Sequence, residues 1–519
     1  MKQKIVLYNP KSTPFSQRTR IAPLALLSIS KLLDRKKFDI KIIIDNYYEN
    51  ALGNLLKECS NALCLGITAL TGYQIIDGLH VSKILKEKYP KLKIIWGGCH
   101  TTILPRQTAE NELVDIVVKG QGERTFSELA DALSAKKSLK KIPGIVYKEN
   151  GMIIENPDRP FEDINNFPRM PYELLENLED YITEYSSPNA DSKRAIPYIS
   201  SYGCPYRCGF CCEHAVSKRR WVGLKPEKVI EEVEWLVKNH NVDGLILYDN
   251  NFFVDKERIR KICQLIIKKN LKVNWFNGDG RAREILKFDN ELWELMKKAG
   301  MRMILIGAES GLQEALDLMQ KDLTVEETIQ ITKKATEKKI ILSFGFMVGL
   351  PWSSDLKKTR GKTDEELKAT LAIIDQIIKI DPVHTISLFI YAPYYSTPLY
   401  AKSLKAGFKD PEKLEDWGKI VFDKVSTPWI SKEQVLKVYM FKYFMFFLYP
   451  GAKENLEQKF KKQNIFLRLV FKPLFFLFYA ACKFRWKFKI FAVPIDYWIY
   501  RQSRKFFKVN ELYEEQEIE

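Results

Sequence analysis

The alternation of short apolar runs with amphipathic stretches constrains the fold of this chain more than any other feature. The stretches between the runs, such as Tyr73–Tyr89 and Arg124–Ser134, repeat their apolar residues with helical spacing. The runs themselves are short and rich in β-branched residues, as buried parallel strands are. The alternation before residue 147 predicts a doubly wound, Rossmann-like α/β sheet. The six predicted strands are Ile5–Tyr8, Ile40–Ile44, Leu63–Ile67, Leu92–Trp96, Val114–Val118 and Gly144–Tyr147.

A second series of strands and helices begins near residue 195. Because six strands are too few for a closed eight-stranded barrel, residues 195–406 are predicted to form a partial (β/α)6 barrel of the TIM type, with its site at the carboxyl ends of the strands. Residues 148–194 contain five prolines and little periodicity, which predicts a linker. The six predicted strands are Ile196–Ser200, Gly244–Tyr248, Val273–Asn277, Met303–Gly307, Ile340–Val348 and Thr385–Ile390.

The C-terminal region, residues 407–519, is predicted to be helical, aromatic and basic. Val438–Tyr449 reads as one helix, and residues 465–500 mix aromatic residues with lysine and arginine. The longest uncharged run there, Pro473–Cys482, is about half of the roughly 20 residues that a membrane-spanning helix needs. The segment is expected either to pack on the barrel or to lie in a membrane interface through its apolar face.

Length, charge and cysteine content indicate the number of domains and the cellular compartment. At 519 residues it is too long for one core, and its net charge of +17 is spread along the sequence, so it does not select a nucleic-acid partner. Nine cysteines, four of them in one loop, are unlike a secreted disulfide framework and favour a reducing cytoplasm. The first apolar run breaks at Asn9-Pro10, which is too early for a signal peptide.

One short loop holds three cysteines at C-x3-C-x2-C spacing: Cys204, Cys208 and Cys211. Thiolates are the ligands of iron–sulfur clusters, and three of them leave one iron of a four-iron cluster open to another ligand. A zinc site completed by His214, and free buried thiols, are the alternatives. Cys212 is expected to be a bystander.

Two glycine-bearing loops follow predicted strands of the first unit, at the sheet edge where such folds bind ligands. Gly97 and Gly98 lie in Trp96–Thr102, and Gly120 and Gly122 lie in the next loop. Neither loop matches a nucleotide fingerprint. The glycines either form tight turns or leave bare backbone beneath a flat ligand.

The cysteine loop and its companions resemble the radical S-adenosylmethionine (SAM) enzymes, in which an aromatic residue precedes the last cluster ligand, as Phe210 does here. The resemblance continues in family order at predicted strand ends. The matching segments are Tyr248-Asp-Asn-Asn-Phe252, Ile306-Gly-Ala-Glu-Ser-Gly311, Phe346-Met-Val-Gly-Leu-Pro351 and Tyr391–Tyr400, where Ser396 stands in place of a common glycine.

The first unit resembles the cobalamin-binding half of the B12-dependent radical SAM enzymes, the branch that includes class B methyltransferases and the anaerobic magnesium-protoporphyrin IX monomethyl ester cyclase. The segments that carry this likeness are Trp96–Pro105 and Val114–Phe126. The D-x-H-x-x-G motif of the lower cobalt ligand is absent, since Asp77-Gly-Leu-His80 has the wrong spacing, and His100 is the histidine of the glycine loop.

The resemblance implies three cofactors, namely a [4Fe-4S] cluster on the three cysteines, SAM and cobalamin. It implies that the reduced cluster cleaves SAM to a 5′-deoxyadenosyl radical, for methylation of an unactivated carbon or for cyclisation or rearrangement. It also implies roles for single residues: Phe210 beside the adenine, Asp249 and Asn250 at the methionine amino group, and Glu309 with Arg281 at the ribose or carboxylate. Gly97, Gly98, His100, Gly120 and Gly122 are the expected cobalamin contacts.

Three other functions stay open at this point: a radical SAM enzyme that has lost cobalamin, a methylthiotransferase-like enzyme acting on RNA, and a non-enzymatic iron–sulfur electron-transfer protein. The expected partners are a small-molecule or lipid-like substrate and a reductant protein of the flavodoxin or ferredoxin type. Nucleic acid is not expected. A cytoplasmic protein is predicted, and residues 465–500 either pack on the barrel or make peripheral contact with the inner face of the membrane.

Overall fold

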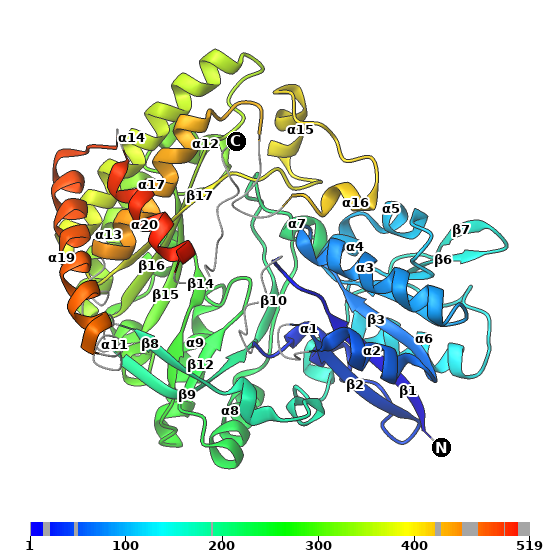
Figure 1. The fold of residues 1–519 in the computed structure, drawn as a ribbon. Coiled ribbons are helices and arrows are strands. Elements are labelled where there is room, and N and C mark those ends of the chain that lie inside the picture. Colours follow the sequence, from blue (N-terminus) through cyan, green and yellow to red (C-terminus); the bar gives the residue numbers. More distant parts are fainter. Residues whose placement is uncertain are drawn as a thin grey trace.

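The computed structural model describes residues 2–13, 21–45, 50–187, 190–420, 427–448, 465–491 and 494–506. It consists of an N-terminal sheet with helices on both faces, an open barrel, and a group of C-terminal helices (Figure 1). The C-terminal helices lie at the edge of the molecule that is remote from the N-terminal sheet (Figure 1). The α/β fold predicted from the sequence is confirmed.

The first sheet has the strand order β2-β1-β3-β4-β5-β6-β7, so the strands are added toward one edge from β1 to β2 and toward the other edge from β3 onward. Ligands of such sheets bind where the two directions meet, beyond the carboxyl ends of the strands. The first five strands pair in parallel. Their bounds are β1 (Gln3–Asn9), β2 (Phe38–Ile44), β3 (Ala62–Thr68), β4 (Lys93–Gly97), β5 (Ile116–Val118), β6 (Ile145–Glu149) and β7 (Met152–Glu155).

Helices bury both faces of this sheet, which is why its strands are apolar without alternation. Ile5 and Leu7 of β1 belong to one core cluster, with α1 (Leu24–Ile29) and α6 (Gly122–Ser134). Val6 and Tyr8 belong to the other, with the helices of the opposite face. Those helices are α2 (Ala51–Cys59), α3 (Tyr73–Lys88), α4 (Cys99–Ile103) and α5 (Pro105–Glu110).

The sixth predicted strand is present but antiparallel. β6 forms a hairpin with β7 through Asn150 and Gly151, which have φ angles of 52° and 77°. Positive φ at both central residues is what a two-residue hairpin turn requires, and Asn-Gly supplies it at little cost. The region predicted as a linker therefore begins by extending the first sheet.

The rest of residues 148–194 packs against the barrel. Three short 3-10 helices occur there, and Phe167, Met170 and Tyr172 are buried in the main core. The Tyr172 hydroxyl donates to the backbone oxygen of Pro197 over 2.8 Å. The short helices are η1 (Ile164–Asn166), η2 (Tyr172–Leu174) and η3 (Leu178–Tyr181), and the segment ends in β8 (Thr183–Ser187), which pairs antiparallel with the first barrel strand.

The barrel is open and built from six parallel runs, as predicted. Its third run is split at Asn277, where φ is 57°, so that one part pairs with the preceding strand and the other with the following one. The strands are β9 (Ala190–Tyr198), β12 (Gly244–Leu247), β13 (Asn274–Phe276), β14 (Gly278–Gly280), β15 (Met303–Glu309), β16 (Ile341–Val348) and β17 (Thr385–Ile390).

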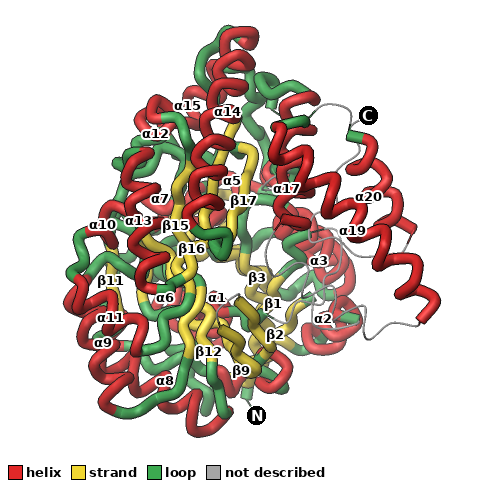
Figure 2. The backbone as a smooth tube through the Cα atoms, turned by 90° about the vertical axis from the view of Figure 1, so that its left-hand side faces the viewer, coloured by secondary structure: helices red, strands yellow, loops and turns green. Residues whose placement is uncertain are grey.

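Helices follow the barrel strands and cover their outer side, as Figure 2 shows by colour. Two helices after β17 return to the first unit, where the Trp417 indole donates to Gln107 over 2.6 Å. The helices of this region are α8 (Pro226–His240), α9 (Lys256–Lys268), α10 (Ala282–Leu286), α11 (Asn290–Lys298), α12 (Gln313–Leu318), α13 (Val325–Lys338), α14 (Leu356–Ile380), α15 (Pro398–Lys405) and α16 (Leu414–Trp417).

Three C-terminal helices complete the described chain: α17 (Lys432–Leu448), α19 (Ile465–Phe488) and α20 (Ile495–Phe506). α17 packs on β17 and on α19. The helix predicted at Val438–Tyr449 is confirmed as far as Leu448, and its last residue lies outside the described ranges. No helix within these ranges is long and apolar enough to cross a membrane.

Candidate functional site

The cysteine loop follows β10 (Ser201–Gly203), which pairs antiparallel with β11 (Trp221–Gly223). Gly203 has a φ of 81°, and a Cβ there would run into the Arg220 backbone, so the close approach of the two strands requires glycine. Backbone hydrogen bonds from the Gly209 amide to Met319, 2.6 Å, and from the Leu399 amide to Gly209, 2.9 Å, hold the loop from two sides. The loop ends in α7 (Glu213–Val216).

The three predicted ligands, Cys204, Cys208 and Cys211, lie in this one loop, each partly exposed and free. Burial raises the pKa of the Cys211 thiol to about 12, so a bound cation is needed to hold it as the thiolate at neutral pH. In the described part of the chain, no three His, Cys, Asp or Glu side chains converge on one ion position. A four-iron cluster does not need such convergence, because each thiolate binds a different iron.

His214 is not positioned to complete a zinc site with the cysteines. Its Nδ1 lies 2.6 Å from the backbone oxygen of Cys211, and its Nε2 lies 3.2 Å from that of Ser396. Both ring nitrogens thus face carbonyl oxygens of the loop and of the neighbouring segment. The histidine joins these two segments and is not the fourth member of a tetrahedral set.

Arg281 connects the cysteine loop to the segment around Lys321. Its Nη1 donates to the sulfur of Cys208 over 3.2 Å, and its guanidinium lies 4.0 Å from the centre of the Tyr206 ring. Its Nη2 donates to the backbone oxygen of Lys321. Arg281 lies between β14, the second part of the split third strand, and the first residue of α10.

A buried ion pair between Glu309 and Lys321 lies beside Arg281. The sequence motifs predicted Glu309 as a site residue but not Lys321. Glu309, at the end of β15 with a φ of 61°, accepts from Lys321 Nζ over 2.6 Å. The same ammonium lies 5.7 Å from the centre of the Phe210 ring. Burial raises the pKa of Asp279, which faces Lys321 and Glu309, to about 7. Lys321 and Asp279 stand in no motif, so only the fold brings them here.

Asp249 and Asn250 are adjacent in sequence but have different surroundings. Asp249 is fully buried and accepts from the Ser200 amide, the Ser200 hydroxyl and the Ser201 hydroxyl, at 3.2, 2.8 and 2.5 Å. It therefore fixes the chain that enters the cysteine loop. Asn250 is exposed, donates to Glu213 over 3.1 Å and accepts from the Gly203 amide over 3.3 Å.

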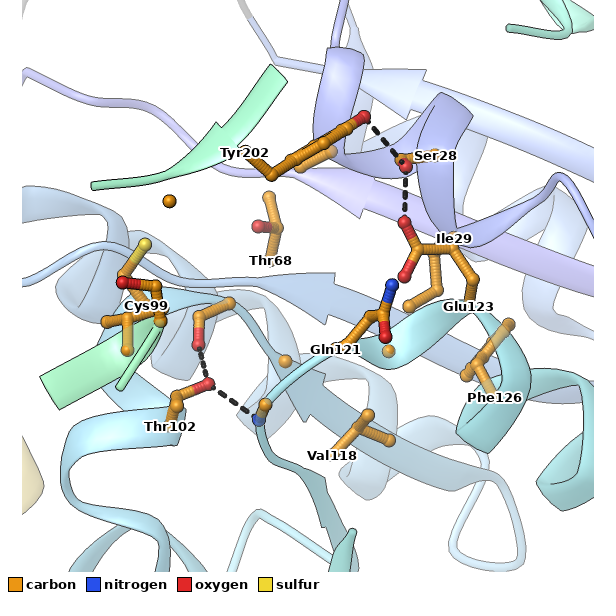
Figure 3. A pocket seen from close by; sticks show the side chains of 18 of the residues that line it. Ser28, Ile29, Thr68, Cys99, Thr102, Val118, Gln121, Glu123, Phe126 and Tyr202 are labelled. Carbon is orange, nitrogen blue, oxygen red and sulfur yellow. Dashed lines mark hydrogen bonds between the residues drawn. The ribbon is translucent and has the colours of Figure 1, made fainter. Parts of the chain in front are cut away.

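A cavity of about 640 Å³ lies between the carboxyl ends of the first sheet and the segments that flank the cysteine loop (Figure 3). That volume is within the range of small-molecule and cofactor sites. Residues from the first unit and from the barrel line it together, so both units are needed to form it. The lining includes Gly66, Gly97, Gly98, Cys99, Gly120, Gln121 and Gly122 on one side and Tyr202, Glu213, Arg220, Trp221 and Asn250 on the other.

The glycines differ in what they leave open. A Cβ at Gly120 would meet nothing within 4 Å, and one at Gly97 would meet only Val118, at 3.8 Å. These two positions present bare backbone to the cavity. At Gly98 and Gly122 a Cβ would press against Ala69 and Ile29, so these two glycines serve close packing. The site thus fits a large flat ligand over Gly97 and Gly120.

Hydrogen bonds within the first unit, and one between it and the barrel side, lie in the cavity wall (Figure 3). The Ser28 hydroxyl donates to Glu123 over 2.7 Å and lies 3.3 Å from the Tyr202 hydroxyl of the barrel side. The Thr102 hydroxyl donates to the backbone oxygen of Gly98 over 2.8 Å and accepts from the Gly120 amide over 3.0 Å. The second set joins the two glycine loops, so their spacing is fixed before a ligand binds.

His100 is the only predicted cofactor contact of the first unit that does not line the cavity. Its Nδ1 lies 2.9 Å from the Thr71 hydroxyl, and its ring is 5.8 Å from that of Trp417. Burial lowers the pKa of His100 to about 4, so the imidazole is neutral at pH 7. The histidine lies in the contact between α4 and α16.

Comparison with known proteins agrees with this geometry. The model of the radical SAM superfamily matches residues 198–373, and that of the B12 binding domain matches residues 17–130. An uncharacterized methyltransferase of Pyrococcus horikoshii is 28% identical over 489 residues, covering 92% of this chain and 99% of that protein. An anaerobic magnesium-protoporphyrin IX monomethyl ester cyclase of Synechocystis is 26% identical over 482 residues, covering 91% of this chain and 88% of that protein.

Two solved structures share the fold at identities too low to show more. The cobalamin-dependent SAM radical enzyme OxsB, with aqua-cobalamin and SAM bound, aligns with a TM-score of 0.70 at 16% identity over 98% of this chain and 75% of its own. The radical SAM methyltransferase TsrM from Kitasatospora setae aligns with a TM-score of 0.61 at 19% identity over 79% of this chain and 76% of its own.

A doubly wound sheet and an open barrel with a cysteine loop between them define a radical SAM fold preceded by a cofactor-binding domain. The chain belongs to the B12-binding-domain-containing radical SAM enzymes. A radical SAM domain and a B12 binding domain imply a [4Fe-4S] cluster, SAM and cobalamin as cofactors. The comparisons do not support the three alternative functions, namely a radical SAM enzyme that has lost cobalamin, an RNA-modifying enzyme and an electron-transfer protein.

Proposed function

We propose that the chain transfers a methyl group to an unactivated carbon of a small molecule, using the cavity of Figure 3 for cobalamin and the cysteine loop for the cluster. The observation that supports this proposal is that one cavity is lined both by Gly97 and Gly120 and by Tyr202 and Asn250, which flank the cysteines. When bound, the cluster with SAM supplies a 5′-deoxyadenosyl radical, and cobalamin supplies the methyl group.

Cys204, Cys208 and Cys211 are the proposed cluster ligands. Arg281 donates to the Cys208 sulfur and offsets part of the negative charge that thiolates bring into a partly buried loop. Asp249 is assigned a supporting role and not the direct contact with the methionine amino group that its motif implies, because its oxygens already accept three hydrogen bonds from Ser200 and Ser201.

The proposed SAM contacts are Phe210, Asn250 and the buried pair of Glu309 and Lys321. Phe210 presents its ring beside the Lys321 ammonium, and Asn250 is exposed next to the loop. The carboxylate of Glu309 is suited to hydroxyl or ammonium donors, and the ammonium of Lys321 to a carboxylate. Because both charges are fixed by each other before SAM arrives, the site needs little rearrangement to orient it.

Gly97, Gly98, Gly120 and Gly122 are the proposed cobalamin-binding positions of the first unit. Gly97 and Gly120 face the open cavity, and Gly98 and Gly122 allow the loops to pack behind them. His100 is assigned to the contact with Trp417 and not to cobalt. No histidine is among the residues that line the cavity, so none is proposed as a lower cobalt ligand.

Several relatives are methyltransferases, and these favour methylation. They include a cytidylyl-2-hydroxyethylphosphonate methyltransferase of Streptomyces wedmorensis, 23% identical over 458 residues, which span 79% of this chain and 83% of that protein. The cyclase relatives make cyclisation the second candidate. The proposed substrate is a small apolar or lipid-like molecule. The proposed electron donor is a protein of the flavodoxin or ferredoxin type. The protein is proposed to act in the cytoplasm, with membrane contact through residues 465–500.

Anaerobic reconstitution, followed by dithionite and SAM carrying a labelled methyl group, tests the proposal. Wild type is expected to form 5′-deoxyadenosine and to pass the label to bound corrinoid. Cys208→Ala is expected to do neither, and Cys263→Ala, which removes a buried thiol on α9, serves as the matched control. No 5′-deoxyadenosine above the Cys208→Ala level would reject the radical-enzyme mechanism, and cyclisation would leave the label out of the product.

A further inference from the structure

The C-terminal helices expose an unusual amount of apolar surface. More than half of the large apolar side chains that are exposed in the described ranges lie between Phe446 and Ile499. Isolated apolar side chains on a surface are ordinary, but a group of them on neighbouring elements marks an interaction surface. The members of this group are Phe446, Phe476, Leu477, Phe484, Phe488, Ile490, Ile495, Trp498 and Ile499.

On α19 the buried and exposed apolar residues occupy opposite faces. Phe478, Cys482 and Trp486 are buried at 0–8% exposure, and their spacing places them on one side of the helix. Leu477, Phe484 and Phe488 are 65, 58 and 56% exposed and lie on the other side. The inner face accounts for the packing on α17, so packing on the barrel leaves the outer face unexplained.

Lysines flank the exposed apolar row. Lys483 and Lys487, one turn apart, are exposed beside Phe484 and Phe488. Neither pairs with a carboxylate among the described residues, whereas Lys489 pairs with Asp375 over 3.3 Å. No aspartate or glutamate occurs between Ile465 and Ile495. This side of α19 is therefore positive throughout and complementary to an anionic surface.

α20 continues the surface. Ile495, Trp498 and Ile499 are 62, 41 and 52% exposed and share one side of the helix. The helix is held to α19 by the Arg485–Asp496 ion pair and by the ring contact of Phe478 with Tyr500 at 6.2 Å. Tryptophan beside aliphatic residues is typical of segments at the level of lipid headgroups.

We infer that the outer face of α19 and α20 docks on the surface of an anionic lipid bilayer, with Leu477, Phe484, Phe488, Ile495 and Trp498 entering the interface and Lys483 and Lys487 on the headgroups. An apolar row flanked by cations, on a helix too polar to span, is the pattern of an interfacial helix. The inference names the partner for the membrane contact proposed above and does not rest on the reaction. Figure 1 places these helices at the edge away from the N-terminal sheet, whose glycine loops line the cavity, so docking there would leave that side of the molecule free.

Vesicle flotation of the full-length reconstituted protein tests this assignment. Vesicles of phosphatidylcholine alone and of phosphatidylcholine with phosphatidylglycerol are compared at low and high salt. Wild type is expected to float with the anionic vesicles and less so at high salt. Leu477→Gln/Phe484→Gln/Phe488→Gln is expected to lower the bound fraction roughly tenfold or more. The matched control, Met152→Gln, changes a 65% exposed methionine of β7 and is expected to bind as wild type does.

A second pair of variants tests the role of charge. Lys483→Gln/Lys487→Gln removes the two lysines of the proposed surface, and Lys272→Gln/Lys298→Gln removes two exposed lysines elsewhere as the control. Only the first is expected to lose the preference for anionic vesicles. Circular dichroism and the cluster absorbance of every variant show whether it has folded. Equal flotation of wild type and the triple variant, or none by wild type, overturns the inference. Self-association of wild type in sedimentation, abolished by the triple variant without vesicles present, would make a second copy the occupant and would also overturn it.

Discussion

The guanidinium of Arg281 donates to the sulfur of Cys208 over 3.2 Å, so a permanent cation touches one of the three proposed cluster ligands. A positive charge beside a cluster favours the reduced, more negative state. Arg281→Met is therefore expected to lower the midpoint potential of the cluster, by on the order of 100 mV for one charge at this distance. A titration followed by electron paramagnetic resonance measures the potential.

Arg283→Met is the control for this change, because Arg283 is two residues away and pairs with Glu327 on α13 over 2.8 Å. Iron and sulfide content should be the same in wild type and both variants. An unchanged potential in Arg281→Met, with a full complement of iron, would show that the arginine only supports the loop.

The buried pair of Lys321 and Glu309 predicts a non-additive response to mutation. Lys321→Met leaves the Glu309 carboxylate without its partner in a site where the two side chains are only 9 and 13% exposed. A loss of about 3 kcal/mol in the free energy of unfolding is expected. Lys321→Met/Glu309→Gln should recover most of it, since the uncompensated charge is gone. Urea unfolding of wild type, Lys321→Met, Glu309→Gln and the double variant measures the coupling energy between the two side chains. Strictly additive losses in the free energy of unfolding would contradict the predicted coupling.

Glu366 on α14 predicts a pH dependence of stability. It is fully buried and accepts from the Gly349 amide over 2.9 Å, and burial raises its pKa to about 7. A carboxyl group whose folded pKa is raised stabilises the fold at low pH, and this stability is lost as the pH rises through about 7. Glu366→Gln is therefore expected to be more stable than wild type at pH 8.5, on the order of 2 to 3 kcal/mol.

The advantage of Glu366→Gln should disappear as the pH falls toward the ordinary glutamate range. Thermal melting of both proteins at several pH values is the measurement. Glu365→Gln, at a neighbouring side chain that is 63% exposed, should follow wild type apart from a small constant offset. If the difference in stability between wild type and Glu366→Gln does not vary with pH, the two amide hydrogens of the glutamine side chain, and not the charge of Glu366, would account for it.

The fold was largely predictable because its strands are buried on both faces and its helices are amphipathic, which are local features of the sequence. The hairpin of β6 and β7 was missed although Asn150-Gly151 is a strong turn signal, because the proline-rich segment after it resembles a linker. The split at Asn277 was not predicted, although Asn277-Gly278 is also an Asn-Gly pair; one part of the run pairs with β12 and the other with β15.

The site was predictable where its residues lie in motifs. The cysteine loop, Asn250, Arg281, Glu309 and Phe210 are brought together in the region that the resemblance implied. Lys321 was missed because its role depends on reaching back to Glu309 from beyond α12, a contact that sequence spacing does not encode. His100 was predicted to contact the cofactor, but it is not among the residues that line the cavity and lies beside Trp417, a contact that its own loop does not reveal.

The central claim is that the cavity between Gly97 and the barrel holds cobalamin, and one measurement tests it most directly. A Cβ at Gly97 meets only Val118, at 3.8 Å, so Gly97→Leu is expected to fold and to keep its cluster while its side chain takes up space in the cavity where the ligand would lie. Gly361→Leu adds the same side chain at an equally open position on α14, outside the cavity.

The three proteins are purified anaerobically with hydroxocobalamin, and corrinoid is quantified by its absorption against iron and protein. The structure predicts stoichiometric corrinoid in wild type and Gly361→Leu, and a loss of most of it in Gly97→Leu with the iron content unchanged. Corrinoid retained equally by Gly97→Leu and wild type, or retained by none of the three, would contradict the assignment of this cavity.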